Sequence, residues 1–314
     1  MNPYRRPVGL CVLLAALSLA ACSKGTNAPP PDNKTAPPAA SAPVAQEGLP
    51  QITLSPDSVH IDYRVWGKGE PAVILIHGWA CDSYYWNAQI DELKAKYTVV
   101  ALNLAGHGAS ESNRKDWSMA NYGQDVAAVA RRIDNRQIVL VGHSMGGTVA
   151  LEAAPVIGDR VIGIIAVDAL KSIGLPPSTQ QQIDARMAPF QNSFIETTRE
   201  YVSKHLFRKD ADPAFVQKVA YDMSLEPPDI AIASLRALSG IDFNKVLPNI
   251  RVPVYAINSD LTLTDEARIR KSLPAGFKVD MLDHTDHFLM MEVPQRFNPV
   301  LLKDIDDLVQ QAKH

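Results

Sequence analysis

One serine in this chain has the surroundings that turn a hydroxyl group into a nucleophile. Ser144 is the centre of a Gly-His-Ser-Met-Gly pentapeptide at 142–146, which follows the apolar run 137–141 and precedes a helix-like stretch at 147–154. In this pattern, the nucleophile elbow, the serine lies on a sharp strand-to-helix turn, and small flanking residues let backbone segments pass closely beneath it. The pattern predicts that the Ser144 hydroxyl projects above a sheet.

The elements that must position this serine alternate along the chain. Several apolar runs are continuous, which is typical of parallel strands covered on both faces, and the first two strands are expected to pair antiparallel. Strands are predicted at 52–54, 59–66, 72–76, 97–102, 137–141, 161–167, 253–257 and 278–282. Helices are predicted at 84–95, 119–133, 145–157, 265–272 and 294–312. The alternation predicts a doubly wound, mostly parallel α/β sheet.

One long segment departs from this alternation. Residues 171–245 have helical periodicity without a clear strand, and prolines interrupt them. The segment lies between the sixth and seventh major strands. We therefore expect a helical cap at 171–245, inserted into a core made of residues 51–170 and 246–314.

With these elements in place, the chain resembles the α/β-hydrolase family from about Val59 to the C-terminus. Four motifs occur in the family's order: His-Gly-Trp at 77–79, Asn-Leu-Ala-Gly-His-Gly-Ala-Ser at 103–110, the elbow at 142–146, and Asp-His-Phe at 286–288 followed by Met-Glu-Val-Pro at 291–294. The family usually begins the second motif with aspartate, and Asn103 stands there in this chain. That residue normally supports a turn, so the chemistry is little affected.

The resemblance implies the partners that Ser144 needs, because a serine hydroxyl at neutral pH is a weak nucleophile. His287 lies after the last predicted strand, where the family places its histidine, and would act as the general base. His284 is the nearby alternative. The backbone N–H groups of Trp79 and Met145 would form the oxyanion hole.

Two aspartates can orient the imidazole of His287. Asp260 follows the strand 253–257, in the loop where most of the family carries its acid, and we prefer it. Asp168 ends the strand 161–167, where a minority of the family, including some haloalkane dehalogenases, carries the acid instead. Asp168 would otherwise cap or anchor the following segment, and Asp260 would otherwise form a turn.

A serine nucleophile with a histidine base suits acyl transfer to water, from esters, lactones, thioesters or amides. The related dehalogenases and epoxide hydrolases use aspartate at the elbow, so Ser144 argues against both. The leading expectation is an enzyme that hydrolyses a carboxylic ester of a small-molecule acyl substrate. Carbon–carbon bond hydrolases and cofactor-free haloperoxidases share this triad and are alternatives. A non-catalytic surface lipoprotein that binds a ligand or partner is the alternative from another class.

The N-terminus carries a separate signal. Two arginines precede an apolar run at 8–20 that is too short to span a bilayer, and Leu-Ala-Ala-Cys at 19–22 resembles the lipobox of bacterial lipoprotein signal peptides. The resemblance implies a signal peptide at 1–21 and a lipid anchor on Cys22 that holds the exported protein at a membrane. Ser23, next in the chain, favours the outer membrane. The alternative is ordinary secretion, to the periplasm or beyond. Residues 22–50, rich in Pro and Ala, are expected to form a tether.

Composition argues against other classes of function. The net charge is −3, with acidic and basic residues interspersed, so we expect no nucleic-acid partner. The His and Asp spacings do not resemble a zinc site, and the glycines do not match a dinucleotide fingerprint, so we expect neither metal nor cofactor. Of the three cysteines, Cys11 leaves with the expected signal peptide and Cys22 carries the lipid, so Cys81 has no cysteine partner and no internal disulfide is expected.

Overall fold

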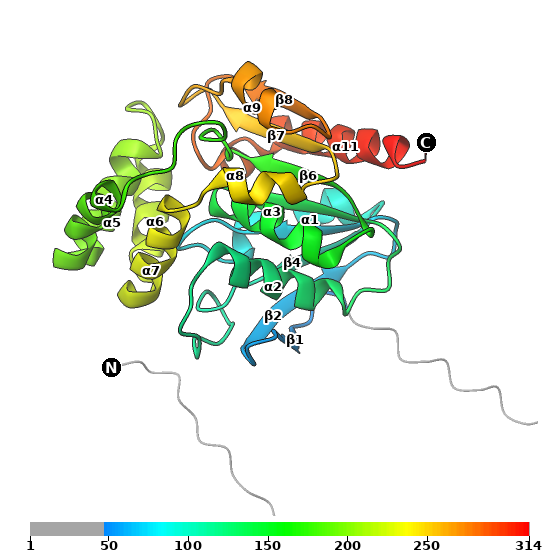
Figure 1. Cartoon of the computed structure of the whole chain (residues 1–314), viewed down its shortest axis with the longest axis horizontal. Helices are drawn as coiled ribbons and strands as arrows, with labels where there is room; N and C mark the ends of the chain where they lie inside the picture. Colours follow the sequence, from blue (N-terminus) through cyan, green and yellow to red (C-terminus); the bar gives the residue numbers. More distant parts are fainter. Residues whose placement is uncertain (1–46, 314) are drawn as a thin grey trace, which may run out of the picture. The chain divides into compact units, whose positions relative to one another are not determined.

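A computed structural model describes residues 47–313, which are built around one eight-stranded sheet (Figure 1). Its strand order is β1-β2-β4-β3-β5-β6-β7-β8. β2 pairs antiparallel with β1 and with β4, and the remaining neighbours are parallel. The strands are β1 (Gln51–Leu54), β2 (His60–Trp66), β3 (Ala72–Ile76), β4 (Thr98–Leu102), β5 (Ile138–His143), β6 (Val161–Val167), β7 (Val254–Ser259) and β8 (Phe277–Leu282). The predicted fold class is confirmed.

Helices cover the central strands. α2 packs against α3 and α1 against α11, and every residue of β3, β4 and β5 is buried. Burial along the whole of a strand requires cover on both faces of the sheet, which explains the continuous apolar runs. The helices of this core are α1 (Asn87–Lys94), α2 (Met119–Ala130), α3 (Met145–Ile157), α9 (Glu266–Ser272), α10 (Leu289–Glu292) and α11 (Pro294–Gln311).

A run of helices lies between β6 and β7, in the segment where the sequence predicts a cap, and Figure 1 shows α4, α5, α6 and α7 grouped to one side of the sheet. These helices are called the insertion below. Two of the prolines that interrupt this segment stand in the first turn of a helix, Pro213 in α6 and Pro228 in α7, where the missing N–H costs no hydrogen bond. The helices are α4 (Gln180–Asn192), α5 (Phe194–His205), α6 (Pro213–Met223), α7 (Pro228–Ser239) and the short α8 (Phe243–Val246).

Two short 3₁₀ helices adjoin the α-helices: one precedes α1 and the other follows α8. The expected helix at 84–95 starts as η1 (Ser83–Trp86), because the Asp82 carboxylate caps the Tyr84 amide, and α1 follows it. η2 (Leu247–Asn249) leads from α8 toward β7. The expected signal peptide, Cys22 and the tether up to residue 46 lie outside the described residues.

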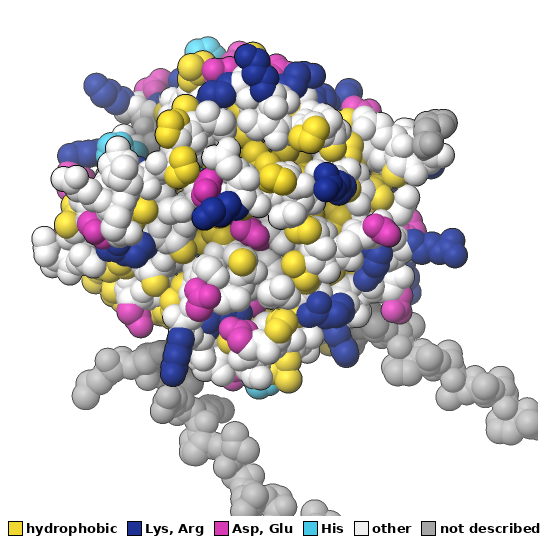
Figure 2. Space-filling view, in the orientation of Figure 1, with side chains coloured by type: hydrophobic (Ala, Val, Ile, Leu, Met, Phe, Trp, Pro, Cys, Tyr) yellow, Lys and Arg dark blue, Asp and Glu magenta, His cyan; other side chains and the backbone are white. Residues whose placement is uncertain are grey.

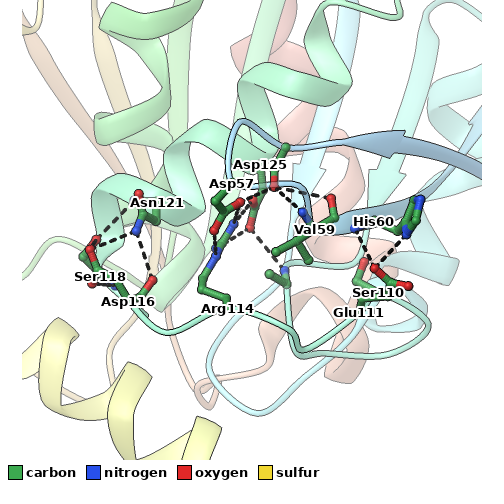
Figure 3. A network of polar contacts seen from close by, with 12 residues as sticks. Asp57, Val59, His60, Ser110, Glu111, Arg114, Asp116, Ser118, Asn121 and Asp125 are labelled. Atoms are coloured by element: carbon green, nitrogen blue, oxygen red, sulfur yellow. Dashed lines mark hydrogen bonds and ion pairs between the residues drawn. The ribbon is translucent and has the colours of Figure 1, made fainter.

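An ionic cluster around the buried Arg114 holds the loop that follows β4 (Figure 3). The Arg114 guanidinium donates to Asp57 Oδ2 (2.7 Å) and to Asp125 Oδ2 (2.9 Å), which also accepts from the Ala105 amide (3.2 Å). The side chains of Arg114 and Asp125 are 1% and 0% exposed. Burial raises the pKa of Asp125 to about 6, against the lowering effect of Arg114. The cluster ties this loop both to the turn between β1 and β2 and to α2.

Candidate active site

Ser144 lies on the turn between β5 and α3, with φ 51° and ψ −115°. A residue with a side chain rarely adopts this conformation, so the turn is strained and its surroundings must hold it. The Ser144 amide donates to Val167 O (2.9 Å). A Cβ at Gly142 would lie 2.2 Å from Gly146 O, and one at Gly146 would lie 2.4 Å from Ile76 O. Both glycines of the pentapeptide are therefore required by close backbone approach.

His287, in the loop between β8 and α10, is paired with Asp168. The Nδ1 atom of His287 lies 2.6 Å from Oδ2 of Asp168, so Nδ1–H donates to the carboxylate. The other carboxylate oxygen, Oδ1, accepts from the Ser259 amide (2.9 Å) and hydroxyl (2.8 Å), and Lys171 Nζ lies 2.6 Å from it. One oxygen thus faces the imidazole while the other is anchored.

Opposing effects set the ionisation of Asp168. Burial raises its pKa, but the hydrogen bond and charge of His287, together with Lys171, outweigh burial and hold the pKa below its ordinary value. The carboxylate is therefore ionised at neutral pH and can stabilise a positively charged imidazole.

Asp260, the acid preferred from sequence, lies elsewhere. Its carboxylate pairs with Arg208 and accepts from the Thr285 amide (3.3 Å). Its side chain is 37% exposed, compared with 4% for Asp168. β7 continues to Ser259, two residues beyond the predicted strand end, and this places Asp260 past the edge of the sheet. We therefore revise the expected partner of His287 from Asp260 to Asp168.

The alternative base, His284, and three buried histidines near the site have other surroundings. Burial lowers the pKa of His77 to about 3 and that of His107 to about 4, so both rings are neutral and buried. His284 lies in the turn after β8 with φ 50°, and its contact with Asp260 is through its backbone. His143, also neutral because burial lowers its pKa to about 3, donates Nε2–H to the carbonyl of His287 (2.9 Å). His143 thus supports the loop that carries His287.

The two amides predicted to form the oxyanion hole come from different segments: Met145 follows Ser144, and Trp79 lies in the loop after β3. Met145 is the first residue of α3, where an amide has no acceptor within the helix. Gly78, before Trp79, packs on the elbow so closely that a Cβ there would lie 3.3 Å from the Cβ of Ser144. Among residues 47–313, neither the Trp79 nor the Met145 amide donates to a backbone carbonyl. Their role as the oxyanion hole stays a prediction.

The Trp79 side chain has another task. Its Nε1–H donates to Ala231 O of α7 (2.7 Å), and its ring makes edge contacts with Phe190 and Tyr201 of the insertion. Trp79 therefore fastens the helical insertion to the core. The indole is not part of the lining of the cavity described next.

Ser144, Asp168 and His287 line one cavity of about 1180 Å³ beneath the insertion. The Ser144 hydroxyl and the His287 ring both line this cavity, and within residues 47–313 no hydrogen bond joins them. In hydrolases of this kind such a hydrogen bond often forms only when substrate binds. Much of the remaining lining is apolar, and it includes Leu170, Phe190, Tyr201, Leu206, Leu235 and Leu238. Such a surface suits the apolar part of an acyl substrate.

Sequence reasoning missed two polar partners of this site. Lys171 and Ser259 both contact the carboxylate of Asp168. The sequence offered only a weak indication of these contacts: Lys171 follows one candidate acid, Asp168, by three positions, and Ser259 directly precedes the other, Asp260. Within residues 47–313, no group of three or more His, Cys, Asp or Glu side chains is arranged to hold a metal ion.

Comparisons with known proteins show the family and the fold of the chain. A model of the "Alpha/beta hydrolase family" matches residues 73–300. An uncharacterized protein of Mycobacterium bovis is 36% identical over 116 residues, which are 36% of this chain and 34% of that protein. The match therefore spans about a third of that relative's length.

Two further comparisons extend over most of the chain. The pimeloyl-[acyl-carrier protein] methyl ester esterase of Vibrio atlanticus is 23% identical over 243 residues, 73% of this chain and 89% of that protein. A thermophilic esterase from Thermogutta terrifontis has a similar structure, with a TM-score of 0.71 and 21% identity, covering 83% of this chain and 99% of that one. The structural likeness is a likeness of fold.

Proposed function

The chain belongs to the alpha/beta hydrolase family, and we propose that it is an enzyme that hydrolyses a carboxylic ester, or a related lactone or thioester, through Ser144, His287 and Asp168. One observation carries the proposal: the buried Asp168–His287 pair opens into the same cavity as a serine on a strained turn. The name of the Vibrio relative, an ester hydrolase, supports the choice of bond.

The reaction follows from the protonation pattern of His287. Because Nδ1–H donates to Asp168, Nε2 is left unprotonated and can accept a proton. Nε2 takes the proton of Ser144 while the serine oxygen attacks the ester carbonyl. The developing oxyanion accepts hydrogen bonds from the N–H groups of Trp79 and Met145. His287 then protonates the leaving alcohol. A water molecule, activated in the same way, releases the acid from the acyl-enzyme.

The lining of the cavity supports an apolar acyl group. Leucine and aromatic side chains from the insertion and from the strand ends face the space around Ser144. Burying a methylene group in such surroundings contributes roughly 0.8 kcal/mol. We therefore expect p-nitrophenyl butyrate and hexanoate to have higher kcat/KM than the acetate ester.

The test is Ser144→Ala in the full chain. Loss of the nucleophile should lower ester hydrolysis by roughly a millionfold, toward the residual rate left when a triad is dismantled. A fluorophosphonate probe should label the wild type and not the variant. Ser203→Ala, which changes an exposed serine of α5, is the matched control and should be labelled like the wild type. Equal labelling of Ser144→Ala would overturn the proposal.

A further inference from the structure

A lysine outside the proposed Ser-His-Asp set holds the carboxylate of that set. Lys171 Nζ lies 2.6 Å from Asp168 Oδ1, and the Lys171 side chain is only 16% exposed. Nζ also donates to the Thr262 hydroxyl (2.9 Å) and contacts the carbonyls of Ser259 (3.3 Å) and Thr262 (3.4 Å). The ammonium group is thus enclosed by oxygen atoms from the ends of two neighbouring strands, β6 and β7.

The backbone is shaped to make this contact. Asp168 has φ 44° and Leu170 has φ 61°, two left-handed residues within the turn that follows β6. Such conformations are unfavourable for residues with side chains and persist where the surroundings hold them, commonly at functional sites. The turn brings Lys171 back over the carboxylate. Arg268 of α9 holds the backbone at Lys171 by donating a hydrogen bond to Lys171 O (2.8 Å).

We propose that Lys171 is a positioning residue, which holds the Asp168 carboxylate against His287 and balances its negative charge. The inference rests on the proposed function, since it assigns Lys171 to the same reaction. Lys171 is also the first residue of the expected cap, so the ion pair connects the start of the insertion to the proposed acid.

The charge balance predicts a direction. Without the ammonium group, the buried Asp168 carboxylate is less compensated, and the positively charged form of His287 is favoured. Because the base acts only when it is unprotonated, the acid limb of the kcat/KM profile moves to higher pH.

Other charged or titratable groups surround this pair. His143 of β5 is neutral, because burial lowers its pKa to about 3, and it contacts the backbone of His287. Further groups lie on α4, α5 and α9, on the C-terminal side of α5, and in the loops after β7 and β8: Arg186, Glu200, Tyr201, Lys204, His205, Arg208, Asp260, Arg268, His284 and Asp286. Every one of them is unchanged when only Lys171 is replaced, so the difference between two profiles isolates Lys171.

The experiment compares the pH profiles of kcat/KM for the wild type and Lys171→Met, with p-nitrophenyl butyrate at constant ionic strength. We expect the acid limb to move upward by roughly one pH unit, the order of shift that a neighbouring charge produces. We also expect kcat to fall by roughly tenfold to a hundredfold through looser placement of the base. Lys171→Gln, which keeps a hydrogen-bond donor and removes the charge, should move the limb equally and serves if Lys171→Met does not fold.

Lys245→Met is the matched control. Lys245 pairs with Asp242 at the same three-residue spacing, at 3.8 Å, but its side chain is 83% exposed. This variant should reproduce the wild-type profile. Superimposed profiles for a folded Lys171 variant and the wild type would overturn the inference. If wild-type protein neither hydrolyses esters nor binds the fluorophosphonate, the proposed function fails instead. The NMR titration of His287 in the two proteins then decides the effect of Lys171, and an unchanged titration rejects it.

Discussion

At the residue scale, the geometry separates two aspartates that the sequence left as alternatives. Asp168 is buried, anchored through Oδ1 by Ser259 and Lys171, and presents Oδ2 to His287. Asp260 is half-exposed and paired with Arg208. A carboxylate acts in such a triad by fixing the tautomer of the imidazole and stabilising its charged form, and only Asp168 contacts the ring.

We therefore expect Asp168→Asn to reduce kcat for ester hydrolysis by roughly ten-thousandfold at neutral pH, the loss seen when a triad aspartate becomes asparagine. An asparagine amide can donate to Nδ1, which places the proton on Nε2, where it blocks proton transfer from Ser144. Steady-state kinetics with p-nitrophenyl butyrate would measure the loss.

Asp260→Asn is the matched control for this change. The change removes the ion pair with Arg208 and does not alter the contacts of the His287 ring. Activity should therefore stay within roughly a few-fold of the wild-type value. Thermal melting of both variants would show that each is folded. A near-inactive Asp260→Asn beside an active Asp168→Asn would return the acid to the later strand.

At the element scale, four adjacent parallel strands deliver the site. Ser144 follows β5, Asp168 follows β6, Ser259 ends β7 and His287 lies in the loop after β8. Carboxyl ends of parallel strands meet at one edge of a sheet, where α/β proteins bind their ligands. The register aligns these ends, with His143 beside Val167 and Ser259 beside Leu282. The helical insertion closes the space above them.

The loop after β4 is a second device at this scale, and its ionic cluster predicts a stability effect. His77 accepts from the Leu104 amide (3.0 Å), so this loop also supports the turn that carries Trp79. Arg114→Met would leave Asp125 buried without its cation. We expect the free energy of unfolding to fall by roughly 3–5 kcal/mol, as when one partner of a buried ion pair is removed. Denaturant melts would measure it.

The pH dependence of that loss follows from the pKa of Asp125. Burial already raises this pKa to about 6, above the unfolded value of roughly 3.9, and loss of Arg114 raises it further. Above about pH 6 the variant keeps losing stability relative to wild type, because its unfolded state has released a proton that the folded state retains. The deficit should therefore be smaller at pH 5 than at pH 8. Adding Asp125→Asn should restore part of the loss, and no recovery in the double variant would contradict the explanation.

At the scale of the whole molecule, the surface charges and the N-terminal sequence bear on where the protein is located. Figure 2 shows Lys and Arg side chains interspersed with Asp and Glu over the face it presents. Among residues 47–313, no helix is long and apolar enough to cross a membrane. We propose that the N-terminal segment supplies the attachment, through a lipid on Cys22 after removal of residues 1–21.

The proposed anchor predicts a change in location. In a Gram-negative host, wild-type protein should appear in the membrane fraction and incorporate a palmitate analogue. Cys22→Ala should abolish the label and release or misprocess the protein. Cys81→Ala is the matched control, because Cys81 is a buried cysteine within residues 47–313 and its loss should leave the label unchanged. Wild-type protein that takes up no label would refute the anchor.

The sequence by itself determined the fold and the place of the serine. Apolar strands, amphipathic helices and the elbow are local patterns, and each is read within a few residues of chain. The strand-turn-helix around Ser144 follows from glycines that the backbone needs at 142 and 146. His287 was predicted as the base from the order of the motifs along the chain. That order follows from the fold and requires no knowledge of individual long-range contacts.

Only the tertiary structure decided which carboxylate faces His287. Asp168 and Asp260 both follow strands of the same sheet, and neither local pattern states how far its strand continues or which way the next turn bends. β7 runs on to Ser259, which carries Asp260 past the edge, and the left-handed turn at Asp168 directs its carboxylate across β7. The Lys171 contact arises from the same turn. The contacts of Asp168 with His287 and Ser259 join residues distant in sequence, whereas its contact with Lys171 is local but depends on the backbone conformation of the turn. Both kinds of contact had to be seen in three dimensions.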